Sequence, residues 1–268
     1  MKEPFLKPLP RVIAHRGDSK FYPENTIEAF LSAVEMGVDV IETDVHLTKD
    51  HKIVVSHDAS LQRNTNGIGE IEERTLKELK KLDAGYNFSN DGGKSYPFRS
   101  KGVTLPTLEE VLEACPYQRF NIDLKSKNGA IVDVFEKAIR ENRAVERVLC
   151  ASFHLSHLKQ MRKLNPQILT SVTTAEVLPL LLKQKLDILP KSLNIGRTLV
   201  FQVPIRQWAI TVVNKKFVQE FHKRNAVIQV WTVNDEPTMR ELFQLGVDSI
   251  MTDDPRTLIK VAKELNLL

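Results

Sequence analysis

Short runs of β-branched residues alternate with longer stretches of helical periodicity along this chain, and that alternation constrains the fold more than any other feature. Repeated strand–helix units of this kind are typical of a parallel sheet covered by helices. The pattern predicts eight strands, at residues 12–14, 38–44, 120–124, 147–151, 168–172, 199–203, 227–231 and 247–251. Eight units in 268 residues predict an α/β fold, a closed (β/α)8 TIM barrel. An open, doubly wound sheet would have the same periodicities, but no glycine-rich dinucleotide-binding motif follows any predicted strand.

The predicted helices between these strands each have one apolar face and recognisable end signals. Asn25 precedes Glu28 at the spacing of a capping box, which predicts that a helix begins there. Asp235 and Pro237 predict the start of a later helix, which Gly246 would end. Helices with a single apolar face are expected to form an outer ring around the barrel.

One segment, residues 59–106, interrupts the alternation after the second predicted strand. It contains six of the eleven glycines and little apolar periodicity, which indicates an insertion. Thr75 and Glu78 form a capping box that predicts a short helix within it. We expect residues 1–268 to form a single domain, with 59–106 as an inserted segment that caps one mouth of the barrel.

Charge and composition exclude several classes of protein. The 38 lysine and arginine residues exceed the 34 aspartate and glutamate residues by only four, so no nucleic-acid partner is implied. No apolar run approaches the roughly 20 residues that a membrane span needs, and we expect no integral membrane segment and a cytoplasmic location. Cys115 and Cys150 match no metal or redox spacing and are expected to be buried free thiols.

Acidic residues are concentrated at the carboxyl ends of the first predicted strands, where barrel enzymes carry their chemistry. The second strand ends in Glu42 and Asp44, whose side chains point to the same side because they alternate. The third strand adds Asp123, with Lys125 on the same face. Three hard oxygen donors of this kind favour Mg²⁺, Ca²⁺ or Mn²⁺.

Basic residues accompany these carboxylates. Arg16 follows His15 at the end of the first strand, and its guanidinium fork matches phosphate oxygens, which indicates an anion site. A short strand that begins at Ile53 delivers His57 shortly after the carboxylate pair. Each residue alone would suit a structural role, but burying so many charges costs several kcal/mol per unpaired ion. Together they predict a functional site.

The remaining histidines receive no role. We expect them on loops or helix surfaces, without a carboxylate at comparable spacing. They are His46, His51, His154, His157 and His222.

Short motifs of these and later residues occur in a characteristic order. They are His15-Arg16-Gly17, Glu24-Asn25-Thr26, Glu42-x-Asp44, His57-Asp58, Asp123-x-Lys125, Trp231-Thr232-Val233-Asn234 and Thr252-Asp253-Asp254-Pro255. In type and order they resemble the glycerophosphodiester phosphodiesterase family, and the block that ends at His57-Asp58 is the most specific part. The family fold is a (β/α)8 barrel with an inserted segment after the second strand, to which residues 59–106 correspond.

The resemblance implies roles for the matching residues. The implied acid–base pair is His15 and His57. The implied phosphate-binding residues are Arg16 and Lys125. The implied ligands of a divalent metal, Mg²⁺ or Ca²⁺ or else Mn²⁺, are Glu42, Asp44 and Asp123. The implied substrate pocket includes Glu24, Asn25 and Trp231. The family usually has Glu where this chain has Asp123, whose side chain is one methylene shorter.

The resemblance also implies an activity, the metal-dependent hydrolysis of glycerophosphodiesters to sn-glycerol 3-phosphate and an alcohol. Physical chemistry supports it, because a cation, Arg16 and Lys125 would stabilise the charge that develops on phosphate oxygens. Two histidines can divide the proton transfers. The residues leave open which histidine is the acid. They also leave open whether water attacks directly or a glycerol hydroxyl first forms a cyclic phosphate.

Three other functions fit parts of the pattern. A lysophospholipase D acting on lysophospholipids would need an apolar groove. Aromatic residues that could line such a groove are Phe88, Tyr96, Phe98, Phe201 and Trp208. A non-catalytic phosphate-binding barrel would leave both histidines without a purpose, and a Schiff-base aldolase using Lys125 would leave the carboxylates idle. We therefore expect a small-molecule glycerophosphodiester as the substrate.

Overall fold

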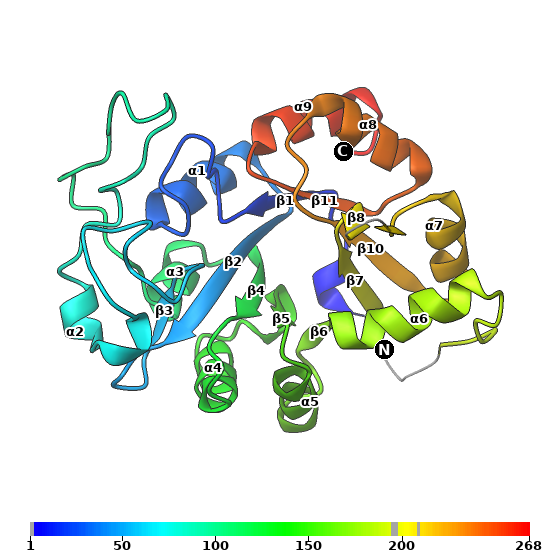
Figure 1. The fold of residues 1–268 in the computed structure, drawn as a ribbon, viewed down its shortest axis with the longest axis horizontal. Coiled ribbons are helices and arrows are strands. Elements are labelled where there is room, and N and C mark those ends of the chain that lie inside the picture. Colours follow the sequence, from blue (N-terminus) through cyan, green and yellow to red (C-terminus); the bar gives the residue numbers. More distant parts are fainter. Residues whose placement is uncertain (1–2, 194–197, 208–209) are drawn as a thin grey trace.

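The computed structural model describes residues 3–193, 198–207 and 210–268, and within them eight parallel strands close into a barrel (Figure 1). The strands are β1 (Val12–His15), β2 (Val40–Leu47), β4 (Arg119–Leu124), β5 (Val148–Ala151), β6 (Leu169–Val172), β7 (Leu199–Val203), β10 (Ala226–Val230) and β11 (Ser249–Thr252). The barrel closes because β1 pairs with both β11 and β2. Each predicted strand overlaps one of these, so the predicted (β/α)8 barrel is confirmed.

An outer ring of helices surrounds the strands (Figure 1). Its members are α1 (Ile27–Met36), α3 (Leu108–Ala114), α4 (Ala130–Glu141), α5 (Leu155–Leu164), α6 (Thr174–Lys185), α7 (Lys215–His222), α8 (Glu236–Leu245) and α9 (Pro255–Glu264). Single-turn 3-10 helices add η1 (Pro4–Leu6) and η3 (Val145–Arg147). As predicted, Asp235 caps the start of α8 and Gly246 ends it in the left-handed conformation. The predicted start of α1 is wrong by one residue, because the side chain of Thr26, not that of Asn25, caps the helix.

The barrel interior is apolar at the amino ends of the strands and polar at their carboxyl ends. The apolar interior cluster contains Phe5, Ile13, Val40, Leu149, Ala151, Leu169, Val200, Val227 and Met251. Phe5 closes this end, where Arg119 at the start of β4 donates a hydrogen bond of 2.8 Å to its carbonyl. A larger core fills the space between the strands and the helix ring. The chemistry-bearing side chains are therefore left to the carboxyl ends of the strands.

The segment after β2 forms a lobe with its own small core. Its elements are β3 (Ile53–Val55), which pairs antiparallel with β2, η2 (Ile71–Glu73) and α2 (Leu76–Leu79). The predicted capping box of Thr75 and Glu78 is confirmed at the start of α2. The core of the lobe contains Val54, Leu61, Ile71, Leu79, Ala84, Val103 and Leu105. The lobe meets the loop between β1 and α1 where the ring of Phe98 lies 5.5 Å from that of Tyr22.

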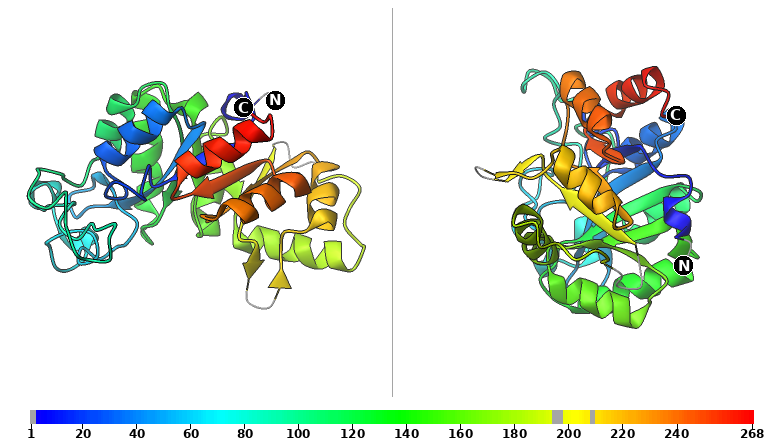
Figure 2. Two further views of the ribbon diagram at one scale, coloured as in Figure 1. Left: turned by 90° about the horizontal axis from the view of Figure 1, so that it is seen from above. Right: turned by 90° about the vertical axis from the view of Figure 1, so that its right-hand side faces the viewer.

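A hairpin that the periodicity does not predict follows β7. Its strands are β8 (Arg206–Gln207) and β9 (Ile210–Thr211). Figure 2 shows this hairpin projecting on the side of the barrel where α6 lies. Only Val177 and Gln184 of α6 are fully buried, so this helix packs more loosely than a ring helix is expected to do.

Two expectations from composition can be compared with the structure. Cys115 and Cys150 are buried free thiols, as predicted. Among the helices of the described ranges, none combines the length and the apolar character needed to cross a membrane.

Candidate active site

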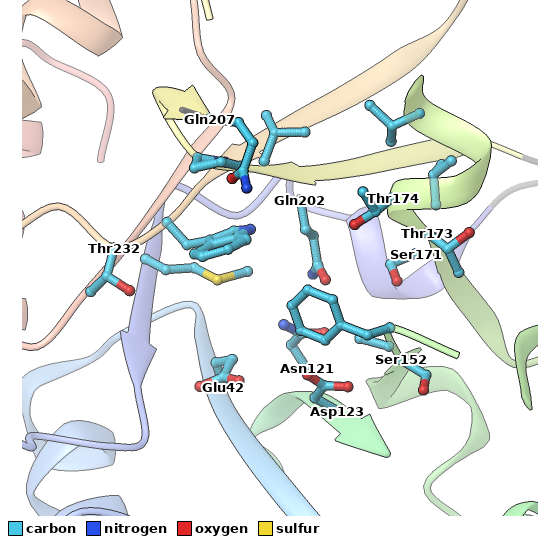
Figure 3. A pocket seen from close by; sticks show the side chains of 18 of the residues that line it. Glu42, Asn121, Asp123, Ser152, Ser171, Thr173, Thr174, Gln202, Gln207 and Thr232 are labelled. Atoms are coloured by element: carbon cyan, nitrogen blue, oxygen red, sulfur yellow. The ribbon is translucent and has the colours of Figure 1, made fainter. Parts of the chain in front are cut away.

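A cavity of about 370 Å³ opens at the carboxyl ends of the barrel strands. It is lined by eight of the ten predicted site residues: His15, Arg16, Glu42, Asp44, His57, Asp123, Lys125 and Trp231. Figure 3 shows Glu42 and Asp123 at one end of the cavity and Gln207 at the other. The remaining two predicted residues, Glu24 and Asn25, lie behind this lining and contact Arg16 and Asp44.

Three buried carboxylates from β2 and β4 form the floor of one half of the cavity. Parallel pairing places Asp44 opposite Asp123, and Glu42 lies two residues earlier on the same face of β2. Burial, together with the charge of Asp44, raises the pKa of Glu42 to about 8. Burial also raises the pKa of Asp123, whose Oδ1 has no hydrogen-bond partner among the described residues. The three carboxyl groups therefore concentrate negative charge in this half of the cavity, which disfavours the charged forms of Glu42 and Asp123.

Two cations from the chain compensate part of that charge. Lys125 Nζ lies 2.8 Å from Asp123 Oδ2 and 3.1 Å from Asp44 Oδ1. Burial would lower the pKa of Lys125, but these two carboxylates outweigh it and raise that pKa. Arg16 Nε lies 3.4 Å from Asp44 Oδ2, while its Nη1 donates a hydrogen bond of 3.0 Å to Glu24. Both cations line the cavity, where a phosphate could reach them.

The donor set of these carboxylates suits a hard divalent cation. Buried aspartate and glutamate oxygens are the ligands that Mg²⁺ and Ca²⁺ prefer, and the unpartnered Oδ1 of Asp123 supplies one of them. As the side chains stand, no three histidine, cysteine, aspartate or glutamate residues of the described ranges converge into a metal-binding group. Lys125 bridges Asp44 and Asp123 instead. The donor atoms of these residues therefore suit a divalent cation. In this structure the ammonium group of Lys125 compensates part of the negative charge of Asp44 and Asp123.

His15 is held by a carboxylate that sequence reasoning gave no role. Its Nδ1 donates a hydrogen bond of 2.6 Å to Asp253 Oδ1, which also accepts from Ser19, while Asn234 donates to the other oxygen. Burial would lower the pKa of His15, but the negative charge of Glu42 and the bond to Asp253 raise it. With Nδ1 engaged, Nε2 is the nitrogen available for a bound substrate.

His57, on the loop after β3, has the same arrangement. Its Nδ1 donates a hydrogen bond of 2.6 Å to Asp58 Oδ1, and Arg63 binds the second oxygen of that carboxylate. Asp58 and Asp253 each belong to a motif quoted above, so the sequence contained both residues but gave no signal of their contact with a histidine. The site thus contains two histidines that line one cavity, and each is hydrogen-bonded to a carboxylate outside the lining.

Glu24 and Asn25 support the lining residues. Arg63 donates two hydrogen bonds, of 2.7 and 2.8 Å, to the carboxylate of Glu24. Burial would raise the pKa of Glu24, but the bonds from Arg63 and the charge of Arg16 lower it to about 2. Asn25 donates to Asp44 Oδ2 at 3.1 Å and accepts from Thr43 at 2.7 Å, with a positive φ of 59°. Both residues position charged groups rather than face the cavity.

The other half of the cavity is mainly apolar. Its lining comes from β6, β7, α6 and the hairpin: Val172, Val177, Leu178, Leu181, Val203, Pro204, Ile210 and Val212. At the mouth, Phe153 stacks edge-on against Trp231, with ring centroids 6.4 Å apart, and Lys125 Nζ lies 5.2 Å from the Phe153 ring. Trp231 therefore lies between the charged and the apolar half.

Four of the five aromatic residues predicted for an apolar groove lie in the described ranges, and none of these four lines this cavity. Phe201 is buried against Phe221 in the outer core, and Phe88 packs edge-on against Phe98 within the inserted lobe. Tyr96 lies under the guanidinium of Arg99 in the same lobe. The last predicted residue, Trp208, lies outside the described residues. For the four described residues the prediction is wrong, because aromatic content does not reveal which face of an element points into the barrel.

The expectation for the remaining histidines is wrong in three cases. His46 is buried on β2 and His157 is buried on α5, so neither is on a loop or an exposed helix face. His222 Nε2 lies 2.8 Å from Asp248 Oδ2, a carboxylate that lies 26 residues away in the sequence. None of these three histidines lines the cavity.

Comparison with known proteins gives a consistent result. A sequence model of the Glycerophosphoryl diester phosphodiesterase family matches residues 15–257. The chain is 34% identical over 264 residues to a glycerophosphodiester phosphodiesterase from Caldanaerobacter subterraneus, covering 94% of this chain and 98% of that one. It is 27% identical to a lysophospholipase D from Mus musculus, covering 93% of this chain and 85% of that one.

A solved structure is also similar. A phosphodiesterase from Oleispira antarctica, in complex with the product sn-glycerol-3-phosphate, superposes with a TM-score of 0.77 at 26% identity. The match covers 96% of this chain and 98% of that chain. The similarity therefore extends over the whole barrel and includes the inserted lobe.

Proposed function

Because this chain belongs to the glycerophosphoryl diester phosphodiesterase family, we propose that it cleaves small glycerophosphodiesters by histidine acid–base catalysis with a divalent metal. The products would be sn-glycerol 3-phosphate and an alcohol. Glycerophosphodiester phosphodiesterase activity itself is supported by the family match and by the relative that is 34% identical. One observation carries the finer proposal: two histidines, each held by a carboxylate, line a single cavity together with three buried carboxylates.

The phosphate of the substrate would bind between the two cations of the charged half. A phosphodiester has one negative charge, which grows as a nucleophile adds to phosphorus. Arg16 and Lys125 are preorganised by their carboxylate partners and line the cavity, so they can stabilise that charge without reorganising. The sn-glycerol-3-phosphate complex of the Oleispira antarctica protein supports a ligand of this class.

His15 and His57 would carry the protons. One imidazole takes a proton from the attacking oxygen, and the other gives a proton to the leaving alkoxide. Asp253 and Asp58 hold the two Nδ1 atoms, so each ring presents Nε2 in a fixed orientation and any positive charge on the ring is stabilised. The attacking oxygen can belong to water, or to a glycerol hydroxyl that first forms a cyclic phosphate, because the same two residues serve both routes.

The divalent cation would be held by Glu42, Asp44 and Asp123. Support for this assignment comes from the raised pKa of Glu42 and from the unpartnered oxygen of Asp123, because a cation would compensate both. When bound, it would supply positive charge to the phosphate oxygens. We propose Mg²⁺, Ca²⁺ or Mn²⁺, since all of the donors are hard oxygens.

A coupled assay for glycerol 3-phosphate tests this function. Glycerophosphocholine, glycerophosphoethanolamine and glycerophosphoglycerol would be offered with each of the three metals, before and after treatment with a chelator. We expect glycerol 3-phosphate release that disappears with chelation and returns with metal. If none of the three substrates yielded glycerol 3-phosphate, the proposal would be overturned. Full activity in excess chelator would overturn the metal assignment.

A second candidate function is favoured by the apolar half of the cavity. Leu178, Leu181 and Val212 are lining residues that the small head groups above do not need. An acyl chain of a lysophospholipid would bury them, and the relative from Mus musculus is named a lysophospholipase D. Adding lysophosphatidylcholine to the same panel separates the two functions, because this activity releases choline and lysophosphatidic acid instead of glycerol 3-phosphate.

A further inference from the structure

Helix α6 exposes a row of large apolar side chains to solvent. Leu178, Leu182 and Leu186 follow one another at intervals of four residues and are 57%, 60% and 60% exposed. Ile188, just beyond the helix, is 62% exposed. Residues four apart lie on the same side of a helix, so the three leucines form one apolar stripe, and Ile188 follows it in the chain. These four side chains are called here the α6 row. Exposed apolar patches of this kind mark interaction sites, because solvated leucines contribute nothing to folding.

The α6 row continues the apolar half of the cavity. Leu178 belongs to both, since it is exposed and also lines the cavity next to Leu181. Across the opening, Ile210 of the hairpin is 40% exposed and lines the same cavity. Figure 2 shows the hairpin and α6 on one side of the molecule. An apolar path therefore leads from the reaction site to the outer surface.

The residues around the row carry positive charge. Lys183, Lys185 and Lys191 are exposed within or just after α6. The two acidic residues of this stretch are already paired: Glu176 lies 2.6 Å from Arg162, and Asp187 lies 2.6 Å from Lys216. Within the described ranges these three lysines form no ion pair, and their long stems can lie along an apolar surface.

We propose that the α6 row is a docking site for an anionic phospholipid surface, through which a diester with an apolar chain enters the cavity. Leucines that enter the acyl region and lysines that contact anionic head groups are the two elements of interfacial binding. A second copy of the chain fits less well, because a symmetric contact through this patch would bring the lysines of one copy against those of the other. The inference rests on the proposed phosphodiesterase site, and on its second candidate function for the apolar chain of the diester, but docking itself requires no turnover.

Vesicle binding tests the proposal directly. The full chain would be sedimented with vesicles of phosphatidylcholine and with vesicles of phosphatidylcholine plus phosphatidylglycerol. We expect binding to the anionic vesicles that weakens with added salt, because the lysine contribution is screened. The double variant Leu182→Glu/Leu186→Glu should reduce partitioning by about 10-fold or more, since two apolar contacts are lost and two negative charges are added. Neither residue lines the cavity.

A matched variant controls for a general effect of removing an exposed leucine. Leu164, at the end of α5, is 46% exposed and lies outside the row. Leu164→Glu should leave vesicle binding unchanged, and both variants should melt at the temperature of the unmodified chain. Equal binding by the double variant, or no binding of the unmodified chain to either vesicle, would overturn the proposal. A concentration-dependent dimer that the double variant abolishes would assign the row to a second copy instead.

Hydrolysis of glycerophosphocholine separates this inference from the proposed function. This substrate has no apolar chain, so its turnover should be the same in the unmodified chain and in the double variant. Turnover of glycerophosphocholine without vesicle binding would refute the docking proposal and leave the proposed function in place. Vesicle binding without turnover would refute the proposed function and leave docking in place.

Discussion

The two halves of the cavity are built by different parts of the barrel and from different residue types. The half from β1, β2 and β4 contains histidines, carboxylates and two cations, nearly all with a charged partner. The half from β6, β7, α6 and the hairpin contains mainly aliphatic side chains, together with the polar residues Ser171, Thr173, Thr174, Gln202 and Gln207. Figure 3 shows Gln202 above Asn121 and Asp123, where the two halves meet.

The two halves differ in how many substitutions their residues tolerate. A buried charge that loses its partner costs several kcal/mol, so the residues of the charged half depend on one another. Glu42 has a pKa of about 8 because it is buried beside Asp44, and Lys125 stays charged because Asp44 and Asp123 surround it. An apolar lining residue can change size at a cost of about 1 kcal/mol per methylene. Under the proposed function, the charged half would carry the chemistry and the apolar half would select the substrate.

The largest effect should come from the histidines of the charged half. His15→Ala or His57→Ala should each lower kcat by about 100-fold or more, because a proton transfer in the transition state is lost. The loss of kcat in the double variant should be much smaller than the two single losses combined, since the two residues act in one step. Steady-state turnover of glycerophosphocholine measures all three.

A substrate with a good leaving group separates the two roles. A p-nitrophenyl diester needs little protonation of its leaving oxygen, so it should restore turnover in the variant that lacks the acid and not in the one that lacks the base. Asn25→Ser, which changes a residue that only supports Asp44, serves as the comparison for indirect effects. Turnover near that of the unmodified chain in either single histidine variant would remove that residue from the chemistry.

A smaller effect is expected from one carboxylate of the proposed metal site. Asp123→Asn should weaken binding of the divalent metal by about 10-fold or more, with activity partly recovered at high metal concentration. Asp123→Glu should retain substantial activity, because the longer carboxylate can reach the same position. Calorimetric titration of metal into the three proteins, with turnover measured alongside, checks this expectation. Equal metal affinity in the unmodified chain and in Asp123→Asn would mean that Asp123 only pairs with Lys125.

The charged half could be predicted from the sequence because strand geometry fixes it. Side chains alternate along a strand, and the carboxyl ends of parallel strands meet at one end of a barrel. Residues as distant as His15, Asp44 and Lys125 are therefore brought together once the strands are identified. The contact between His15 and Asp253 could not be predicted, since it depends on how β1 and β11 close the barrel.

The apolar half could not be predicted, for two physical reasons. Leucines four residues apart on α6 have the pattern of any ring helix that buries one face, and periodicity does not reveal that α6 leaves them exposed. The strands of the hairpin contain two residues each, too few to show an alternation. For Phe201 the prediction is wrong in the other direction. It is expected to line the groove, but its side chain packs in the outer core.

The apolar half can be tested by a substitution of modest effect. Leu181→Ala should raise KM for lysophosphatidylcholine by about 5-fold, because part of the acyl contact is lost. It should change KM for glycerophosphocholine by less than about 2-fold, since that substrate leaves Leu181 uncovered. Steady-state kinetics on both substrates gives the ratio. An equal change in both KM values would show that the two halves do not divide chemistry and selection as proposed.

The smallest effect concerns the ion network that joins the inserted lobe to the charged half. Arg63 binds Glu24 and Asp58, whose pKa values are both about 2 because its hydrogen bonds and charge outweigh their burial. Carboxylates with a lowered pKa stabilise the folded state above their ordinary pKa, and this stabilisation is lost as the pH falls toward 2. Arg63→Gln should therefore reduce the free energy of unfolding by about 1 kcal/mol at pH 7, a modest value because the arginine is partly exposed to solvent.

The pH dependence distinguishes this network from ordinary packing. At pH 3 the unfolded carboxylates are largely protonated, so the difference between Arg63→Gln and the unmodified chain should be clearly smaller than at pH 7. Arg74→Gln is a matched control, because Arg74 is exposed in the same lobe and donates only to the carbonyl of Ile68. Urea unfolding at both pH values measures the three proteins. If Arg63→Gln were equally destabilised at pH 3 and pH 7, the side chain of Arg63 would stabilise the fold through packing and not through its charge.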